Sequence, residues 1–237
     1  MISEPEIISE GSITEAWRKT AKLIVDQGDR FNVTVHVKEP AGFDEEEIES
    51  LDPKSVDAGA KSVFDVANTI FPRGRRHESD TAVAFLQHYS AVYQRGRSRT
   101  PHAWGTYFQR LLTFGDGGKN QLLKTIDCMN DWKAKPRAAF GVHLSGVHLD
   151  NPRPLGAPCW QYGQFIRTDD SVLSLSVMYR SHDYFQMALG NFLGLSRLLC
   201  FVCRHTKQTA GTLTCLSTYA HLGGKRASTK TLLSSEP

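Results

Sequence analysis

The sequence predicts one α+β domain spanning residues 1–237, with a mixed β-sheet flanked by helices. Segments with apolar residues at helical spacing are interspersed with short strand-like runs, and these segments show no internal repeat. No low-complexity linker divides the chain. A length of 237 residues, with 40% hydrophobic and 22% charged residues, is typical of a single unit with a substantial core.

Helices dominate the first half of the predicted fold. Residues 14–26 carry apolar side chains at helical spacing, and the run 31–37 alternates between apolar and polar residues like a strand. The acidic stretch 44–52 is interpreted as a solvated helix face. Further helices are expected at 63–71, closed by Pro72, at 80–93 and at 120–132.

Two basic segments interrupt these helices. The first contains Arg73, Arg75, Arg76 and His77, and the second contains Arg95, Arg97 and Arg99. The first is interpreted as a solvated loop, and the second follows the helix predicted at 80–93. The alternative for the first segment is that it binds a phosphate.

The second half carries more strand signal. Short runs of β-favouring residues at 138–143, 164–167 and 172–179 predict strands. The segment 187–203 is the most apolar long stretch, and it does not alternate, so it predicts a buried helix.

Composition and charge exclude several classes of protein. A net charge of +3 gives no reason to expect binding of a nucleic-acid polymer. No run approaches the roughly 20 apolar residues of a membrane span, and the polar N-terminus lacks the apolar part of a secretory signal. We therefore expect a cytoplasmic protein without membrane contact.

The five cysteines show no spacing typical of a disulfide framework and are expected to be reduced. Cys200 and Cys203 fall within the predicted apolar helix, and His205 alone does not complete a metal site with them. We therefore expect no metal.

Cys159 lies where a reactive thiol can be reached. It follows a segment rich in Pro and Gly and precedes a predicted strand, whereas Cys200 and Cys203 are expected to lie in the core. Arg180 ends the strand at 172–179, and alternation places Ser174, Ser176 and Arg180 on one face of it. A guanidinium near Cys159 would favour the thiolate and could also bind a phosphate. The alternative is a surface ion pair between Arg180 and Asp183.

Five elements of this region stand in the order and near the spacing of the thymidylate synthase catalytic core. They are Pro158-Cys159, Gln164-Phe165, Leu173-Ser174, Arg180-Ser181-x-Asp183 and Asn191. The chain therefore resembles the thymidylate synthase and nucleotide hydroxymethylase superfamily, clearly from 136 to 222, with a polar tail over 223–237. The resemblance implies a thymidylate synthase-like fold, a late strand over 211–222 and a homodimer whose two sheets pack face to face.

The resemblance also implies roles for the motif residues. Cys159 is the nucleophile that adds to C6 of a pyrimidine mononucleotide, while Arg180 and Ser181 hold the phosphate and assist the thiol. Asn191 reads the base edge and His221 approaches the sugar. Asp183 contacts the pterin of 5,10-methylenetetrahydrofolate, which donates the one-carbon unit.

Other residues are assigned by their position beside these motifs. Tyr107, close to Trp104-Gly105, is expected to transfer the C5 proton, with core packing as the alternative. Gln164 is counted among the nucleotide-binding residues, and Ser176 and Lys133 are expected to influence the choice of sugar. An early family glutamate has no clear equivalent, although Asp65 and Glu78 are available.

A basic arm of the family reaches into the neighbouring subunit's site and binds phosphate there. The segment from Lys133 to Arg137 stands where this arm is expected, and Arg137 is the best match. The alternative interpretation of this segment is a solvated turn.

The chemistry requires a thiolate because C5 of a pyrimidine becomes nucleophilic only after addition at C6. An exocyclic methylene then forms at C5, and exclusion of water decides its fate. Trp160 replaces the family's usual histidine, Gln186-Met187 replaces its Leu-Gly pair, and the family's closing tail is expected to be missing or shortened after His221. These departures favour hydroxymethylation.

Within the superfamily, the chain looks most like the cytidylate 5-hydroxymethylases of nucleoside-antibiotic biosynthesis, such as the mildiomycin type. The expected substrate is CMP or dCMP. The alternative is methylation of dUMP or UMP, because the synthases carry an asparagine at the position of Asn191. Two further alternatives are a nucleotide-binding homologue without activity and a cysteine hydrolase that uses His182 or His221 as its base.

Overall fold

The protein is described by a computed structural model covering residues 4–73, 81–96, 104–115, 118–132, 139–150, 156–167, 169 and 171–234, with residues 92–96, 147 and 148 described by backbone alone. A mixed seven-stranded sheet runs in the order β1-β2-β7-β5-β4-β3, and β6 pairs with β7. The pairs β1–β2, β5–β7 and β6–β7 are parallel, and the other pairs are antiparallel. The predicted α+β class is confirmed.

In the described chain, most helices precede β3 and most strands follow α6. The strands are β1 (Glu6–Glu10), β2 (Arg30–Val37), β3 (Ala139–His143), β4 (Trp160–Arg167), β5 (Val172–Tyr179), β6 (His182–Asp183) and β7 (Thr209–His221). The helices are α1 (Ile13–Gln27), α2 (Glu45–Ser50), η1 (Pro53–Ser55), α3 (Val63–Ile70), α4 (Ala82–Gly96), α5 (Tyr107–Leu112), α6 (Gln121–Asp131), α7 (Val147–Asp150), α8 (Ala188–Thr206) and α9 (Arg226–Ser234).

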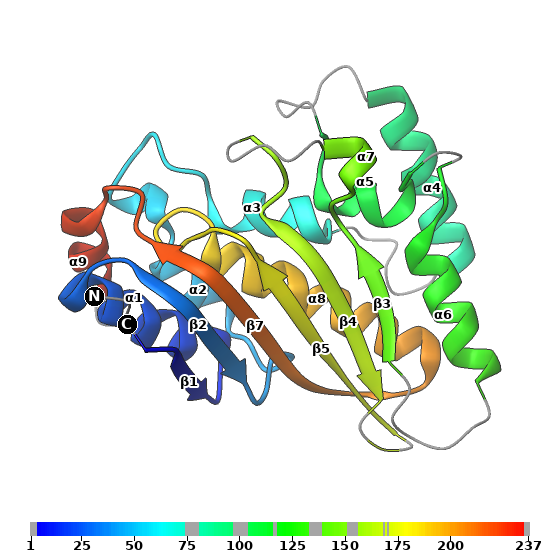
Figure 1. The fold of residues 1–237 in the computed structure, drawn as a ribbon, viewed down its shortest axis with the longest axis horizontal. Coiled ribbons are helices and arrows are strands. Elements are labelled where there is room, and N and C mark those ends of the chain that lie inside the picture. The colour runs from blue at the N-terminus through cyan, green and yellow to red at the C-terminus, as the bar shows by residue number, and fades with distance from the viewer. Residues whose placement is uncertain are drawn as a thin grey trace.

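Helices lie on one face of the sheet, while the opposite face of β7, β5 and β4 carries no described helix (Figure 1). Strand alternation explains the difference. Leu175 and Val177 are buried on the covered face, whereas Met178, pointing the other way, is 37% exposed. Ser176 pairs with Gln164 and Thr214 on this open face.

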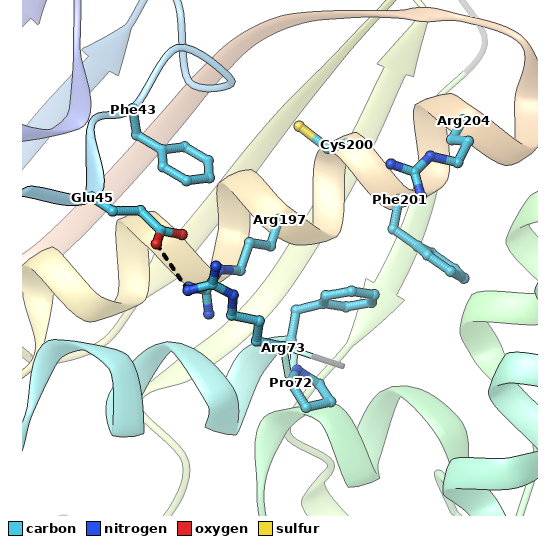
Figure 2. Close-up of a pocket in the computed structure, with 9 residues that line it drawn as sticks. Phe43, Glu45, Pro72, Arg73, Arg197, Cys200, Phe201 and Arg204 are labelled. Carbon is cyan, nitrogen blue, oxygen red and sulfur yellow. Dashed lines mark hydrogen bonds and ion pairs between the residues drawn. The ribbon is translucent and has the colours of Figure 1, made fainter. Parts of the chain in front are cut away.

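The long helix α8 is the centre of the helical layer. It runs behind the sheet (Figure 1), and α3 crosses it closely because glycine occupies positions 190 and 194. A Cβ atom at Gly190 would lie 2.6 Å from the carbonyl oxygen of Val63, and one at Gly194 would lie 2.8 Å from that of Ala67. On another side, α8 lines a pocket together with residues of α2 and the end of α3 (Figure 2).

The N-terminal helix α1 contacts the turn that follows β6. Ser12 and Glu15 form a capping box at the start of α1. The indole Nε1 of Trp17, buried in this helix, donates a 2.7 Å hydrogen bond to the carbonyl oxygen of Tyr184. The helix therefore fixes the backbone between β6 and α8.

The predicted helices at 14–26, 63–71, 80–93, 120–132 and 187–203 are confirmed within a few residues, as are the predicted strands. The acidic stretch 44–52 contains α2, with Ile48 buried. Among the described residues, six elements were not predicted, namely β1, η1, α5, α7, β6 and α9. The last lies in the polar tail and buries Thr229 and Leu232. No helix among the described residues is long and apolar enough to cross a membrane.

Candidate active site

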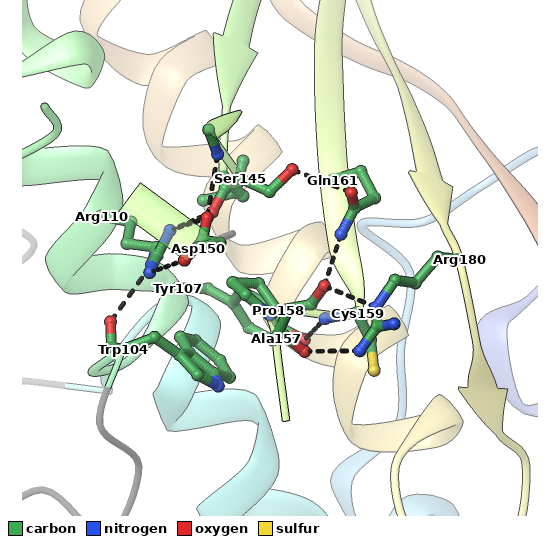
Figure 3. A network of polar contacts seen from close by, with 12 residues as sticks. Trp104, Tyr107, Arg110, Ser145, Asp150, Ala157, Pro158, Cys159, Gln161 and Arg180 are labelled. Atoms are coloured by element: carbon green, nitrogen blue, oxygen red, sulfur yellow. Dashed lines mark hydrogen bonds and ion pairs between the residues drawn. The ribbon is translucent and has the colours of Figure 1, made fainter. Parts of the chain in front are cut away.

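Cys159 and Arg180 meet where β4 begins and the antiparallel β5 ends. Trp160 pairs with Tyr179, so the residues just outside this pair are brought together. The backbone N–H of Arg180 donates to the carbonyl oxygen of Cys159 at 2.9 Å. The guanidinium lies beside the sulfur and within hydrogen-bonding reach of it (Figure 3). The predicted proximity of these residues is therefore confirmed.

The guanidinium of Arg180 is held by the loop that precedes the nucleophile. Its Nε donates to the carbonyl oxygen of Pro158 at 3.2 Å, and its Nη2 donates to that of Ala157 at 3.0 Å. The side-chain amide of Gln161 also donates to Pro158. Neutral carbonyl partners orient the guanidinium and leave its positive charge uncompensated by them, which suits contact with an anionic ligand.

The thiol of Cys159 is half-buried, and its pKa is raised above the ordinary value. Burial is the main cause, because it disfavours the charged thiolate. Arg180 lowers the pKa through its charge and a hydrogen bond, and Asp183 raises it. Arg180 therefore favours the thiolate, as expected, although burial outweighs its effect on the pKa of Cys159.

Tyr107 fixes the backbone at the nucleophile. It is the first residue of α5, and its hydroxyl oxygen accepts hydrogen bonds from the N–H groups of Cys159 at 3.2 Å and Trp160 at 3.3 Å. Its ring packs edge-on against Trp160. Tyr107 is buried, and burial raises its pKa far above the ordinary value. These contacts match the alternative that Tyr107 packs in the core, and they support a role in positioning the backbone of Cys159.

A buried ion pair anchors α5 next to Tyr107. Arg110 donates to both carboxylate oxygens of Asp150, at 2.8 Å and 2.5 Å, and to the carbonyl oxygens of Leu144 and Trp104 (Figure 3). Both charged side chains are buried. Without its partner, either charge would destabilise the folded state, and the bidentate pair removes this penalty. It ties α5 to the segment that follows β3.

Ser181, Asp183 and His221 form a second group beside Arg180. Nε2 of His221 donates to Oγ of Ser181 at 3.0 Å, because Nδ1 already accepts from the N–H of Gly223. One carboxylate oxygen of Asp183 accepts from the N–H groups of Phe185 and Gln186. The parallel pairing of β6 with β7 sets Asp183 opposite His221. The structure therefore brings these predicted residues together.

Asn191 lies deeper than expected. Its side chain is only 2% exposed, its Nδ2 lies 3.1 Å from Nε2 of His182, and its Oδ1 has no hydrogen-bond partner among the described residues. A ligand cannot reach Asn191 without movement of the residues that cover it, and its contact with a base edge stays a prediction.

His182 does not serve the cysteine hydrolase interpretation. It is buried, its Nδ1 lies 2.9 Å from Oγ of Ser217, and its ring stacks on Tyr179 with centroids 4.2 Å apart. Burial, aided by the nearby His221, lowers its pKa to about 3. No general-base contact with Cys159 follows from this position.

Ser176 and Gln164 are not brought to Cys159 within one chain. They face each other as partners of β5 and β4 on the open face. At about 3.3 Å per residue, Ser176 lies roughly 13 Å along β5 from Arg180. Its proposed influence on sugar choice gains no support from this position. Lys133 and Arg137 lie outside the described residues.

Two contributors were missed by the sequence analysis. Oγ1 of Thr218 donates to the carbonyl oxygen of Arg180 at 2.7 Å, which ties β7 to the site. The backbone of Arg30 pairs with Ala220 next to His221, while its guanidinium donates to the side-chain oxygen of Gln27. Cross-strand register, which a sequence does not supply, would have been needed to find either residue.

The described residues contain no group of three or more His, Cys, Asp or Glu side chains that could hold a metal ion. Cys200 and Cys203 lie one helical turn apart in α8, and burial raises the pKa of Cys203 to about 12. A thiol with that pKa is a poor metal ligand near neutral pH.

Comparison with known proteins finds sequence similarity over about half of the chain. A stretch of 117 residues, 49% of this chain, is 32% identical to a protein from Methanococcoides burtonii named "Putative thymidylate synthase". The match covers 52% of the relative, so the chain spans about half the length of the curated relative it matches. No family model matches the chain.

This similarity supports the thymidylate synthase-like superfamily assigned from the motifs. The mixed sheet with helices on one face is consistent with a thymidylate synthase-like fold. The similarity and the proximity of Cys159 to Arg180 are both consistent with the resemblance inferred from the motifs.

Proposed function

We propose that this thymidylate synthase-like chain transfers a one-carbon unit to C5 of a pyrimidine nucleotide through a covalent bond between Cys159 and C6. The observation that carries this proposal is the Arg180 guanidinium beside the Cys159 sulfur at the β4–β5 junction. The similarity to the Methanococcoides burtonii protein supports the same chemistry.

The reaction begins when the Cys159 thiol loses its proton to solvent and the sulfur adds to C6. Arg180 stabilises the thiolate, and the enolate that forms in the ring makes C5 a nucleophile. C5 then attacks the one-carbon unit of methylenetetrahydrofolate. Loss of the C5 proton and the folate amine leaves an exocyclic methylene on the ring.

Arg180 and Ser181 are suited to hold the nucleotide's phosphate. The guanidinium is oriented by two backbone carbonyls, and Ser181 and His221 share a hydrogen bond beside it. A phosphate oxygen accepts from guanidinium and hydroxyl donors alike. Asp183, which also lies near Cys159, supplies a carboxylate oxygen for an N–H group of the pterin.

The finer proposal is hydroxymethylation of CMP or dCMP, in which water adds to the methylene and tetrahydrofolate is regenerated. Trp160 supports it, because its indole is buried and donates to Tyr162 rather than facing the site where the family has a histidine. Methylation of dUMP or UMP is the alternative, in which a hydride from the folate completes the methyl group.

We also propose a homodimer that packs two open sheet faces together. Ser176, Thr214 and the exposed Met178 form a face with short polar and flexible apolar side chains. Such a face can pack closely against a copy of itself through a two-fold axis. In that dimer the arm from Lys133 to Arg137 would bring its charge to the partner's phosphate.

The deciding experiment weighs the product. The protein is incubated with CMP, dCMP, UMP or dUMP and methylenetetrahydrofolate, and the nucleotide is analysed by mass spectrometry. A gain of one formaldehyde unit identifies hydroxymethylation, and a gain of one methylene unit with formation of dihydrofolate identifies methylation. The matched control is Cys159→Ser, which should give no product. If no nucleotide gains mass, or if Cys159→Ser is fully active, the proposal is wrong.

A further inference from the structure

A pocket on the outer side of α8 lies apart from Cys159. Its volume is about 210 Å³, and it is lined by Phe43, Glu45, Phe71, Pro72, Arg73, Arg197, Cys200, Phe201 and Arg204 (Figure 2). At about 1.5 Å per residue, Arg197 lies roughly 9 Å along the helix beyond Asn191, and Arg204 lies roughly 20 Å beyond it. The chemistry proposed for Cys159 does not use this pocket.

The charged residues of the lining are strongly unbalanced. Three arginines, Arg73, Arg197 and Arg204, face a single carboxylate, that of Glu45. Arg73 forms an ion pair with this carboxylate, with Nη1 and Oε2 2.9 Å apart. The described lining therefore has two more positive than negative charges, in a pocket whose walls are largely apolar. A low-dielectric wall strengthens the attraction of such a site for an anion.

Arg197 is the member of this group with unused hydrogen-bonding capacity. Its Nη2 is buried and has no hydrogen-bond partner in the part of the chain that the structure describes. Its Nη1 makes only a long contact of 3.5 Å to Oδ1 of Asn68. Burial, and then the charge of Arg73, lower its pKa. An unpaired guanidinium donor of this kind is costly unless a ligand completes it.

Aromatic rings form the rest of the wall. The rings of Phe71 and Phe201 lie with centroids 5.0 Å apart. Phe43 also lines the pocket, and Figure 2 shows its ring apart from that of Phe201. A planar ring can pack against such surfaces, and guanidinium planes also stack on rings. Pockets that bind drug-sized ligands usually have volumes of about 300–1,000 Å³. The smaller pocket here suits one ring with one charged group.

We propose that the pocket formed by Arg73, Arg197 and Arg204 binds a small organic oxyanion, a carboxylate or phosphate monoester attached to a planar ring. The oxyanion accepts hydrogen bonds from Arg197 and its neighbours, and the ring packs between Phe43 and Phe201. The first basic segment of the sequence thus contributes Arg73 to an anion site, rather than serving only as a solvated loop.

The test is calorimetric titration of the full chain with phenyl phosphate and, separately, with benzoate. The Arg180→Ala protein serves as the background, so that phosphate binding beside Cys159 does not contribute. We expect one saturable site per chain for at least one of these anions. Arg197→Gln should weaken binding at least tenfold, and Arg204→Gln, at an exposed position, should weaken it several-fold. The matched control Arg226→Gln, at an exposed position of α9, should bind the anion with an affinity within twofold of the background protein.

A footprint locates the site independently. The bound anion should slow alkylation of Cys200 by iodoacetamide, and leave alkylation of the exposed Cys128 unchanged. Arg197→Gln should fold with equal or higher thermal stability, because the substitution removes an unpaired buried donor. This readout separates loss of a ligand contact from loss of the fold.

Equal affinity of the background protein and its Arg204→Gln and Arg197→Gln forms would overturn the proposal. So would binding of uncharged phenol as tight as that of phenyl phosphate, or the absence of binding by both anions. Nucleotide turnover depends on Cys159 and Arg180, so failure of the proposed one-carbon transfer leaves this test intact, and the reverse also holds.

Discussion

The hydroxyl oxygen of Tyr107 accepts a 3.2 Å hydrogen bond from the backbone N–H of Cys159. It also accepts from the next N–H, that of Trp160. Tyr107→Phe would leave both N–H groups without this buried partner, which costs about 1–3 kcal/mol in free energy of unfolding. We expect this loss in chemical denaturation, together with a lower kcat and a nearly unchanged KM.

A positioning role and a proton-transfer role for Tyr107 give different results. If Tyr107 positions the nucleophile, Tyr107→Phe also changes the rate at which iodoacetamide alkylates Cys159. If Tyr107 only transfers the C5 proton, that rate stays as in the wild type while release of tritium from C5-labelled nucleotide stops. Tyr162→Phe, on the open sheet face, is the control and should alter neither rate.

Arg180 lowers the pKa of the half-buried Cys159 thiol. Its charge lowers a pKa that burial has raised, so Arg180→Ala should raise the pKa of Cys159 further. Since the thiolate is the reactive form, the pH midpoint of alkylation should move upward, and the rate near neutral pH should fall about tenfold per unit of pKa. The rate is followed by mass spectrometry of the Cys159 peptide.

The same experiment tests the wild-type site. Its midpoint should lie above the value of about 8.5 for an unperturbed thiol. Arg226→Ala, which removes an exposed guanidinium on α9, should leave the midpoint unchanged. A wild-type midpoint below neutral pH would contradict the raised pKa, and an unchanged midpoint in Arg180→Ala would remove Arg180 from thiol activation.

The crossing of α3 over α8 requires a glycine at position 194. A Cβ atom there would lie 2.8 Å from the carbonyl oxygen of Ala67 and 2.8 Å from Cβ of Ile70. Alanine inside a helix usually gains about 0.5–1 kcal/mol over glycine. Overpacking costs about 1–3 kcal/mol, so Gly194→Ala should lower the free energy of unfolding.

Gly42→Ala provides the matched control for this substitution. Its added Cβ would meet nothing closer than the carbonyl oxygen of Glu39 at 3.7 Å. Chemical denaturation should therefore give an unchanged or slightly higher stability. If Gly194→Ala also proved neutral, the two helices would have room to separate and the close crossing would not be needed for stability.

The sequence predicted the long, strongly patterned elements because each carries its own signal. The apolar run that became α8 and the alternation that became β5 needed no tertiary information. The elements β1 and α9 carry little apolar periodicity of their own. They form through partners distant in sequence, since β1 pairs with β2 and α9 packs on α1.

The candidate site was predicted where residues lie at the ends of neighbouring elements. Cys159 and Arg180 flank one strand pair, and Ser181 meets His221 through β6 and β7. Alternation alone also grouped Ser176 with Arg180, but it says nothing of distance along the strand. A motif also does not show how deeply a residue is buried. The burial of Asn191, and the larger effect of burial than of Arg180 on the pKa of Cys159, follow only from the three-dimensional packing.

His182 makes the stability of the fold depend on pH. Buried between Ser217 and Asn191, it has a pKa lowered to about 3, whereas an unfolded histidine titrates near about 6.5. Between these values the unfolded chain binds one more proton than the folded chain. The free energy of unfolding therefore rises with pH, by up to about 1.4 kcal/mol per unit, and this stabilisation is lost as the pH falls from about 6.5 toward 3.

His182→Gln removes the titrating group. The free energy of unfolding should therefore fall less steeply between about pH 7 and about pH 5 than in the wild type, with a slope smaller by up to about 1.4 kcal/mol per pH unit. The measurement is urea denaturation at several pH values in this window, above the range in which most carboxylates titrate. His88→Gln, at an exposed position of α4, is the control and should keep the wild-type slope. A wild-type slope in His182→Gln would mean that the buried ring accepts its proton without unfolding, and that its hydrogen bonds to Ser217 and Asn191 rearrange instead.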